Sequence, residues 1–94
     1  PQAGFIVMPV RIEFYGVPRH RAAVDAVDVE AEDVAGALEE VSVRLPRFAE
    51  TCLVDGRLRD GLIANLNGRE FTTDPTTLLS PGDSLLILSA DAGG

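Results

Sequence analysis

The chain has 94 residues, of which 46% are hydrophobic, and its 15 acidic and 8 basic residues give a formal net charge of −7. This length fits one small domain with little room for an enclosed cofactor, so we expect function on a surface, a groove or a terminus. Phosphate backbones are repelled by the negative charge, which disfavours nucleic acid as a partner. All eight basic residues are Arg, and the lack of Lys excludes Schiff-base chemistry and a P-loop lysine.

One Cys and one His exclude a disulfide framework, a Cys-based zinc site, an iron–sulfur cluster and a multi-histidine metal centre. No apolar run reaches the 18 residues of a membrane span, so we expect no membrane partner. Residues 1–8 are apolar but lack the basic start and the cleavage site of a secretory leader. We interpret residues 1–8 as an extension or a remnant of cloning, and expect a reduced, cytoplasmic protein with a single domain over residues 9–94.

The first half of the chain changes its hydrophobic period once. Residues 9–15 alternate apolar and polar side chains, which predicts a half-buried strand. Residues 16–21 contain Gly and Pro and predict a polar turn or loop, and residues 24–30 predict an antiparallel second strand. Apolar residues then recur at spacings of four, three and four, which predicts an amphipathic helix over residues 34–45 with Asp33 as its N-cap.

The second half predicts irregular chain followed by strands. Residues 47–61 show no clear period, although we expect Phe48 and Leu53 to be buried. Residues 62–66 and 69–72 predict a hairpin around Asn67-Gly68, because both residues tolerate positive φ. After turns near residues 74–83, the nearly all-apolar residues 84–89 predict a central strand paired on both edges.

Two hairpins that flank one helix, with the most apolar strand last, favour an α+β fold. If the first and last strands pair at the centre, the helix covers one face of a mixed sheet of about five strands. This is the β-grasp, or ubiquitin-like, arrangement.

The carboxyl end is the sharpest chemical feature. Residues 90–94 follow a predicted buried strand, end in Gly93-Gly94 and extend to about 16 Å. Glycine has no Cβ, so we expect a flexible, thin tail that can thread a narrow channel. A terminal carboxylate there can be activated by adenylation, although two incidental glycines are the alternative.

Five segments occur in a fixed order: VRIEFY at 10–15, DVAGAL at 33–38, ANLNG at 64–68, LLSPGD at 78–83 and GG at 93–94. Their order and spacing over residues 9–94 resemble the MoaD/ThiS family of ubiquitin-like sulfur-carrier proteins. The resemblance implies the β-grasp fold and a sulfur carrier rather than an enzyme by itself, with catalysis supplied by partner subunits.

The resemblance also implies site residues and partners. Gly94 would be adenylated by an ATP-dependent, ubiquitin-activating-type adenylyltransferase and become a thiocarboxylate, while Gly93 lets the tail be threaded. ATP would be used by that enzyme, and no cofactor would be bound to the chain. In the MoaD branch, the carrier is the small subunit of molybdopterin synthase in molybdenum cofactor biosynthesis, and its tail enters the large subunit. Asp91 and Ala92 stand where such tails are often apolar or Pro, which leaves the choice of partner open.

Four apolar residues are expected on the sheet face away from the helix, where a cluster without cover indicates a partner interface rather than incidental surface. They are Tyr15, Ile63, Leu86 and Leu88. The other chemical candidates are interpreted structurally: Cys52 as an inert half-buried thiol, His20 as a solvated loop residue, and Glu39 and Glu40 as a solvated helix face.

Three further functions stay open on the sequence. The chain could be a protein modifier joined to lysines of other proteins through Gly94, or a sulfur carrier for thiamine or cysteine synthesis. It could also be a non-catalytic β-grasp binding domain.

Overall fold

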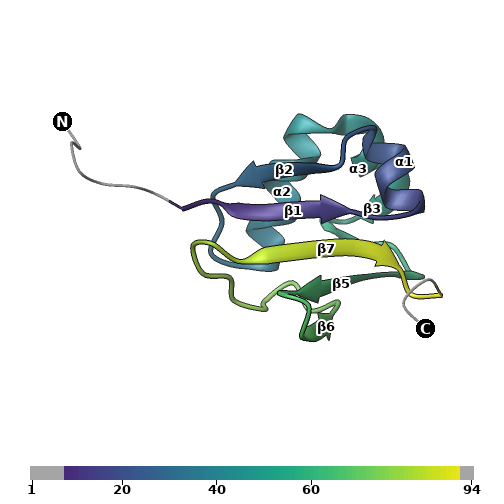
Figure 1. The fold of residues 1–94 in the computed structure, drawn as a ribbon. Helices are drawn as coiled ribbons and strands as arrows, with labels where there is room; N and C mark the ends of the chain where they lie inside the picture. The colour runs from purple at the N-terminus through teal and green to yellow at the C-terminus, as the bar shows by residue number, and fades with distance from the viewer. Residues whose placement is uncertain (1–7, 92–94) are drawn as a thin grey trace.

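The computed structural model describes residues 8–91. Ten elements follow one another along the chain (Figure 1): β1 (Val10–Phe14), α1 (Val17–Ala22), β2 (Ala26–Val29), α2 (Val34–Arg44), α3 (Pro46–Cys52), β3 (Leu53–Val54), β4 (Arg57–Leu58), β5 (Leu62–Leu66), β6 (Glu70–Thr72) and β7 (Ser84–Ser89). No helix within residues 8–91 combines the length and the apolar character needed to cross a membrane.

The main sheet has five strands in the order β2-β1-β7-β5-β6, and β3 and β4 form a separate two-stranded ribbon. The first and last strands, β1 and β7, are parallel, whereas the other pairs in the sheet are antiparallel. The predicted mixed five-stranded sheet with residues 84–89 at its centre is therefore confirmed.

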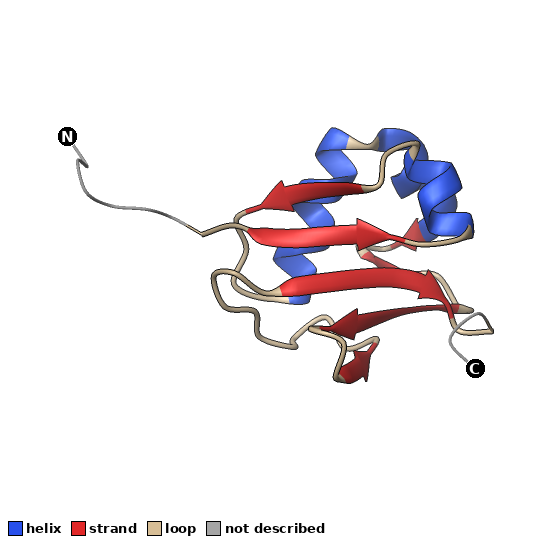
Figure 2. Cartoon of the chain, in the orientation of Figure 1, coloured by secondary structure: helices blue, strands red, loops and turns tan. Residues whose placement is uncertain are grey.

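The helices lie on one side of this sheet and leave the other side without a helix (Figure 2). The core between the two layers is apolar, and its largest fully buried side chains include Ile12, Leu38, Phe48, Leu85 and Ile87. The ring centroids of Phe14 and Phe48 lie 5.0 Å apart and the rings are tilted by 57°, a separation within the range that aromatic pairs prefer. This packing fixes α3 against β1.

The predicted loop over residues 16–21 is wrong, because helix α1 occupies this stretch. Pro18 lies in its first turn, where the fixed φ of proline suits a helix and its missing N–H costs nothing. Gly16 turns the chain into the helix with a φ of 65°, and Pro18 and Ala22 are buried. Gly and Pro here mark the start of a helix instead of a loop.

The helix predicted over 34–45 is confirmed as α2, and the Asp33 carboxylate accepts a hydrogen bond from the Gly36 N–H at 2.8 Å.

The prediction of an irregular stretch over residues 47–61 is wrong in part. Pro46 follows α2 and begins the helix α3, again in a first turn. Phe48 and Leu53 are buried as predicted, with 0% and 8% exposure. Two short helices therefore accompany the one main helix that the sequence predicts.

The hairpin at Asn67-Gly68 is confirmed, with φ angles of 56° and 72°. Asn67 also fastens this hairpin to the turn before β7. Its side-chain N–H donates to the Asp83 carboxylate at 3.0 Å, and its side-chain oxygen accepts from the Ser84 N–H at 2.8 Å. The second Asp83 oxygen accepts from the Ser80 N–H at 2.8 Å.

These bonds generate a prediction about pH. The hydrogen bonds from Asn67 and Ser80 lower the pKa of Asp83 below its ordinary 3.8, because they favour the charged carboxylate. The stability that they contribute is present above the unfolded-state pKa and is lost as the pH falls through the folded-state pKa. In Asp83→Asn, the side chain keeps one acceptor oxygen for two donors, the Asn67 side-chain N–H and the Ser80 backbone N–H. We therefore expect this variant to lower the free energy of unfolding at pH 7 by about 1 kcal/mol.

Urea unfolding of wild type and Asp83→Asn between pH 7 and pH 2 checks this prediction. We expect the difference between the two proteins to shrink below pH 4. Asp60→Asn is the control, since Asp60 is exposed and makes no side-chain hydrogen bond within residues 8–91. A difference that stays constant across this pH range would contradict the role of the Asp83 carboxylate.

Candidate functional site

The last strand is held on both sides as far as its final residues. The Tyr15 N–H donates to the Ile87 carbonyl at 3.0 Å, and the Ala90 N–H donates to the Gly61 carbonyl at 2.8 Å. Asp91, which is exposed, is the last residue that the structure describes. The chain therefore leaves the centre of the sheet between the end of β1 and the start of β5. Ala92, Gly93 and Gly94 lie outside the described residues.

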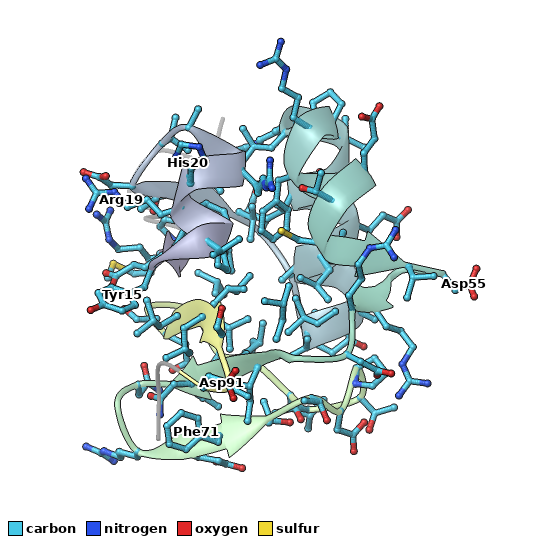
Figure 3. The ribbon with its side chains drawn as sticks, turned by 90° about the vertical axis from the view of Figure 1, so that its right-hand side faces the viewer. Tyr15, Arg19, His20, Asp55, Phe71 and Asp91 are labelled. Carbon is cyan, nitrogen blue, oxygen red and sulfur yellow. The ribbon has the colours of Figure 1, made fainter. Side chains whose placement is uncertain are left out.

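The strand register places the four predicted interface residues on the face without helices. Ile63 is opposite Leu88 in the β5–β7 pair, whereas the adjacent Ala64 and Ile87 belong to the buried core. Because side chains alternate between faces along a strand, Ile63, Leu86 and Leu88 point away from the helices. Tyr15 follows the core residue Phe14 and lies on the side away from α2 and α3 (Figure 3).

These four residues differ widely in exposure. Tyr15 is 56% exposed, Ile63 and Leu86 are half-buried, and Leu88 is only 6% exposed. β7 has a neighbouring strand on each side, so side chains from β1 and β5 cover its own. Leu88 thus offers little surface to a partner, and the expectation that it is accessible is wrong.

Sequence reasoning missed Phe71, which is 54% exposed on the same face. Phe71 is opposite Asn65 in the β5–β6 pair, and Asn65 is opposite Leu86 in the β5–β7 pair. Figure 3 shows Phe71 and Tyr15 on the side of the molecule away from α2 and α3. Counting outward from a two-residue Asn67-Gly68 turn would pair Asn65 with Glu70, whereas three residues separate the paired Leu66 and Glu70 in the structure. The turn signal alone therefore places Phe71 on the wrong face.

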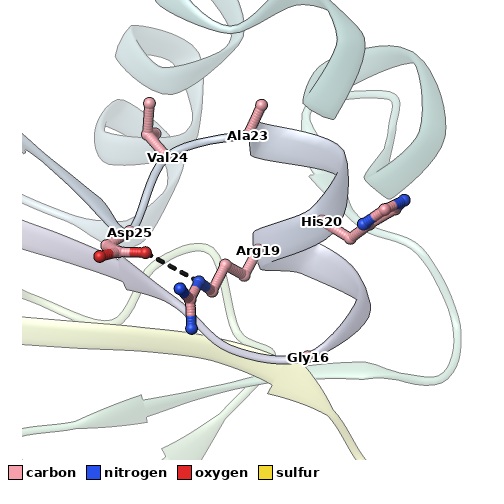
Figure 4. A pocket seen from close by; sticks show the side chains of 6 residues that line it. All are labelled: Gly16, Arg19, His20, Ala23, Val24 and Asp25. Atoms are coloured by element: carbon pink, nitrogen blue, oxygen red, sulfur yellow. Dashed lines mark ion pairs between the residues drawn. The ribbon is translucent and has the colours of Figure 1, made fainter.

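A polar hollow of about 600 Å³ lies beside Tyr15, between α1 and the start of β2 (Figure 4). Arg19 pairs with Asp25 across it at 2.7 Å. His20 is exposed and points to the other side of α1 from Arg19, so it forms no pair with Asp25. The hollow therefore contains an ion pair and lacks an acid–base dyad.

The other candidates lie on the helices α2 and α3. Cys52 is buried with 2% exposure, and its thiol lies 3.7 Å from the Thr51 hydroxyl. Glu39 is exposed and Glu40 is half-buried on α2. Within residues 8–91, no three His, Cys, Asp or Glu side chains gather into a group that could hold a metal ion. At the end of the sheet beside Tyr15, the described residues offer an ion pair and the exposed ring of Tyr15 as surface for binding.

No protein-family model matches the sequence, and neither does any curated protein. Solved structures do match it. The SAMP1 crystal structure from Haloferax volcanii has a TM-score of 0.76 and 21% identity, and the match covers 90% of this chain and 98% of SAMP1. The BexX/CysO complex from Amycolatopsis orientalis contains a chain with a TM-score of 0.73 and 20% identity, over 90% of this chain and 99% of the other.

A third structure is a Pyrococcus furiosus protein with the provisional name molybdopterin converting factor, subunit 1. It has a TM-score of 0.68 and 23% identity, over 87% of this chain and 97% of its own. The chain has the ubiquitin-like β-grasp fold. The resemblance to the MoaD/ThiS family is thereby confirmed at the level of the fold, and the two exposed aromatic residues lie on the helix-free face of a β-grasp sheet.

The burial difference on this face generates a prediction. Leu88→Arg would place a charge at a buried position of the central strand, so we expect it to lower the free energy of unfolding by about 3 kcal/mol. Phe71→Arg changes an exposed position of an edge strand, and we expect a loss below about 1 kcal/mol.

Urea unfolding curves of the two variants measure this difference. Circular dichroism of each variant before denaturant is added serves as the control for native secondary structure. Equal losses of stability would mean that Leu88 is accessible in solution.

Proposed function

We propose that this chain is a sulfur carrier whose C-terminal Gly94 is adenylated, converted to a thiocarboxylate and used as a sulfur donor. We further propose that it acts as the small subunit of molybdopterin synthase in molybdenum cofactor biosynthesis. The observation that carries the proposal is that the sequence pair Gly93-Gly94 ends five residues after β7, the central strand of a β-grasp sheet. The provisional name of the Pyrococcus furiosus neighbour supports the choice of pathway.

The proposed chemistry has two steps, and neither requires a side chain of this protein. A Gly94 carboxylate oxygen attacks the α-phosphorus of ATP and releases pyrophosphate, which gives an acyl-adenylate. Hydrosulfide supplied by the sulfur donor then attacks the acyl carbon and forms a C–S bond. The C–O bond to AMP breaks, so AMP leaves with one former carboxylate oxygen, a proton is released and a thiocarboxylate remains. An ATP-dependent adenylyltransferase would supply the catalytic groups, consistent with the lack of an acid–base dyad in the hollow beside Tyr15.

The reach of the tail limits where that partner can bind. Three residues follow Asp91, and they span at most about 11 Å when extended. A partner that holds the carboxylate in its active site must therefore approach the end of the sheet where Asp91 and Tyr15 lie. The exposed rings of Tyr15 and Phe71 give it apolar area to bury on the adjacent face. The large subunit of molybdopterin synthase would use the same approach.

A cytoplasmic setting fits this chemistry, because activation consumes ATP and the single cysteine, Cys52, is free.

A protein modifier is the second candidate, because several of the structural neighbours are small archaeal modifier proteins. Activation of Gly94 would be the same, but a lysine amine of another protein would attack the acyl carbon. This chain has no Lys, so a modifier of this sequence could not build lysine-linked polymers of itself. Carriers for thiamine or cysteine synthesis would share the activation and differ only in the acceptor.

Changes of tail length test the proposal. Deleting Gly94, or adding one glycine after it, moves the reacting carboxylate by about 3.3 Å, which exceeds the tolerance of a reactive geometry. We expect both variants to lose sulfur transfer. We also expect their thermal midpoints to match wild type, because the buried core lies within residues 10–87.

Intact mass after incubation with ATP, the activating enzyme and a sulfur donor separates the candidates. If wild type exchanges one oxygen for sulfur and the two tail-length variants do not, the result supports the sulfur-carrier function. Covalent adducts of this chain on other proteins support the protein-modifier function. Wild-type rates of thiocarboxylate formation and sulfur donation in the Gly94 deletion would rule out Gly94 as the reactive residue. No mass change in any protein would favour the binding domain.

A further inference from the structure

A groove of about 600 Å³ lies on the helix-covered side of the molecule, between α2, α3 and the β3–β4 ribbon. Its lining includes two buried leucines, Leu38 and Leu53, and two alanines, Ala35 and Ala49. The short alanine side chains leave open space between the helices and the ribbon. An aliphatic side chain could therefore bury its surface there.

Backbone hydrogen bonds hold the walls of this groove in place. The Ala35 N–H donates to the Pro75 carbonyl at 2.9 Å, which fastens the 74–77 loop to the first turn of α2. The ribbon turns at Asp55 and Gly56, whose φ angles are 52° and 75°. The Arg59 N–H donates to the Cys52 carbonyl at 2.9 Å and closes the ribbon on α3. The groove is thus part of the fixed scaffold.

Negative charge predominates at the rim. Glu39 and Asp55 line the groove and are exposed, and neither takes part in the three ion pairs found within residues 8–91. Arg57 also lines the groove, so the rim carries two carboxylates and one guanidinium. The net charge at the rim is therefore negative, which favours a cationic partner.

The groove and the helix-free face lie on opposite sides of the molecule. Figure 3 shows Asp55 on one side, and Tyr15 and Phe71 on the other. A ligand in the groove would therefore not compete with a partner that covers Tyr15 or receives the tail.

We propose that this groove is a second docking site for a short segment of a partner protein, with one aliphatic side chain next to a Lys or Arg. The aliphatic side chain fills the space over Leu38 and Leu53, and the cation lies near Glu39 and Asp55. This site is independent of Gly94 and of the function proposed for it. It would let the protein bind one partner through its sheet and another through its helices.

Titration of the ¹⁵N-labelled protein with the capped pentapeptide Gly-Lys-Leu-Lys-Gly tests the site by NMR. We expect shifts at the amides of Ala35, Ala49 and Asp55, and none at Tyr15 or Phe71. Two capped peptides serve as controls. Gly-Glu-Leu-Glu-Gly replaces the two cations with carboxylates, and Gly-Lys-Ser-Lys-Gly replaces the aliphatic leucine with serine. They should bind at least about fivefold more weakly.

Two variants make the test specific. Ala35→Trp fills the groove from an exposed helix position and should abolish the shifts at Ala49 and Asp55. Glu39→Gln combined with Asp55→Asn keeps the side-chain shapes, and Asn tolerates the positive φ of the turn; it should weaken binding about fivefold. Phe71→Ser, on the opposite face, is the matched control and should bind like wild type.

Three results would overturn the proposal: equal binding of the acidic peptide, unchanged binding to Ala35→Trp, or shifts confined to the helix-free face. The double variant Glu39→Gln with Asp55→Asn tests the contribution of the two carboxylates to binding even if Ala35→Trp perturbs α2.

Discussion

The parallel pairing of β1 with β7 is the interaction on which the rest of this structure depends. It joins residues near the two ends of the chain, from Arg11 with Ser84 to Phe14 with Ile87. A parallel pair requires a long crossover, and here the whole chain between the two strands provides it. Because the crossover includes α2 and α3 on one side, it buries Ile12 and Ile87 and leaves the other side of the sheet without a helix.

This constraint also sets the direction in which the chain ends. β7 runs through the centre of the sheet, and its hydrogen bonds to β1 and β5 continue to the last turn before Asp91. The described chain therefore ends at a fixed point beside the central strand, which is the kind of support that the proposed reaction of Gly94 requires. The exposed side chains of Tyr15 and Phe71 lie on the face beside that point. The pairing thus links the buried core, the helix-free face and the start of the tail.

The sequence predicted most of the fold because its strongest patterns are local. The alternation in residues 9–15, the Asn67-Gly68 turn and the apolar run at 84–89 each specify one element, and only a few strand orders can combine them. The short elements could not be predicted in the same way. Helices α1 and α3 have six and seven residues, so tertiary packing stabilises them more than propensity does. Pro18 and Pro46 do not by themselves distinguish a break from the start of a helix, because proline begins helices as well as ending them.

The sequence predicts which sheet face the candidate residues lie on, but it does not predict how buried each of them is. Period two places Leu88 on the correct face, but its burial depends on neighbouring strands that no local pattern reveals. Phe71 needs the register across two strand pairs, and the groove over Leu38 depends on the packing of α2, α3 and the ribbon. These features arise from contacts between segments far apart in the sequence.

The most direct test of the central claim is the chemical state of the C-terminus in protein isolated from its own cells. Thiol-specific alkylation followed by fragment mass spectrometry would identify sulfur on Gly94 and separate it from any modification of Cys52. The account predicts that a fraction of the chains carries a thiocarboxylate on Gly94. Sulfur on Cys52 alone, with an unmodified carboxylate on Gly94 in every chain, would contradict it.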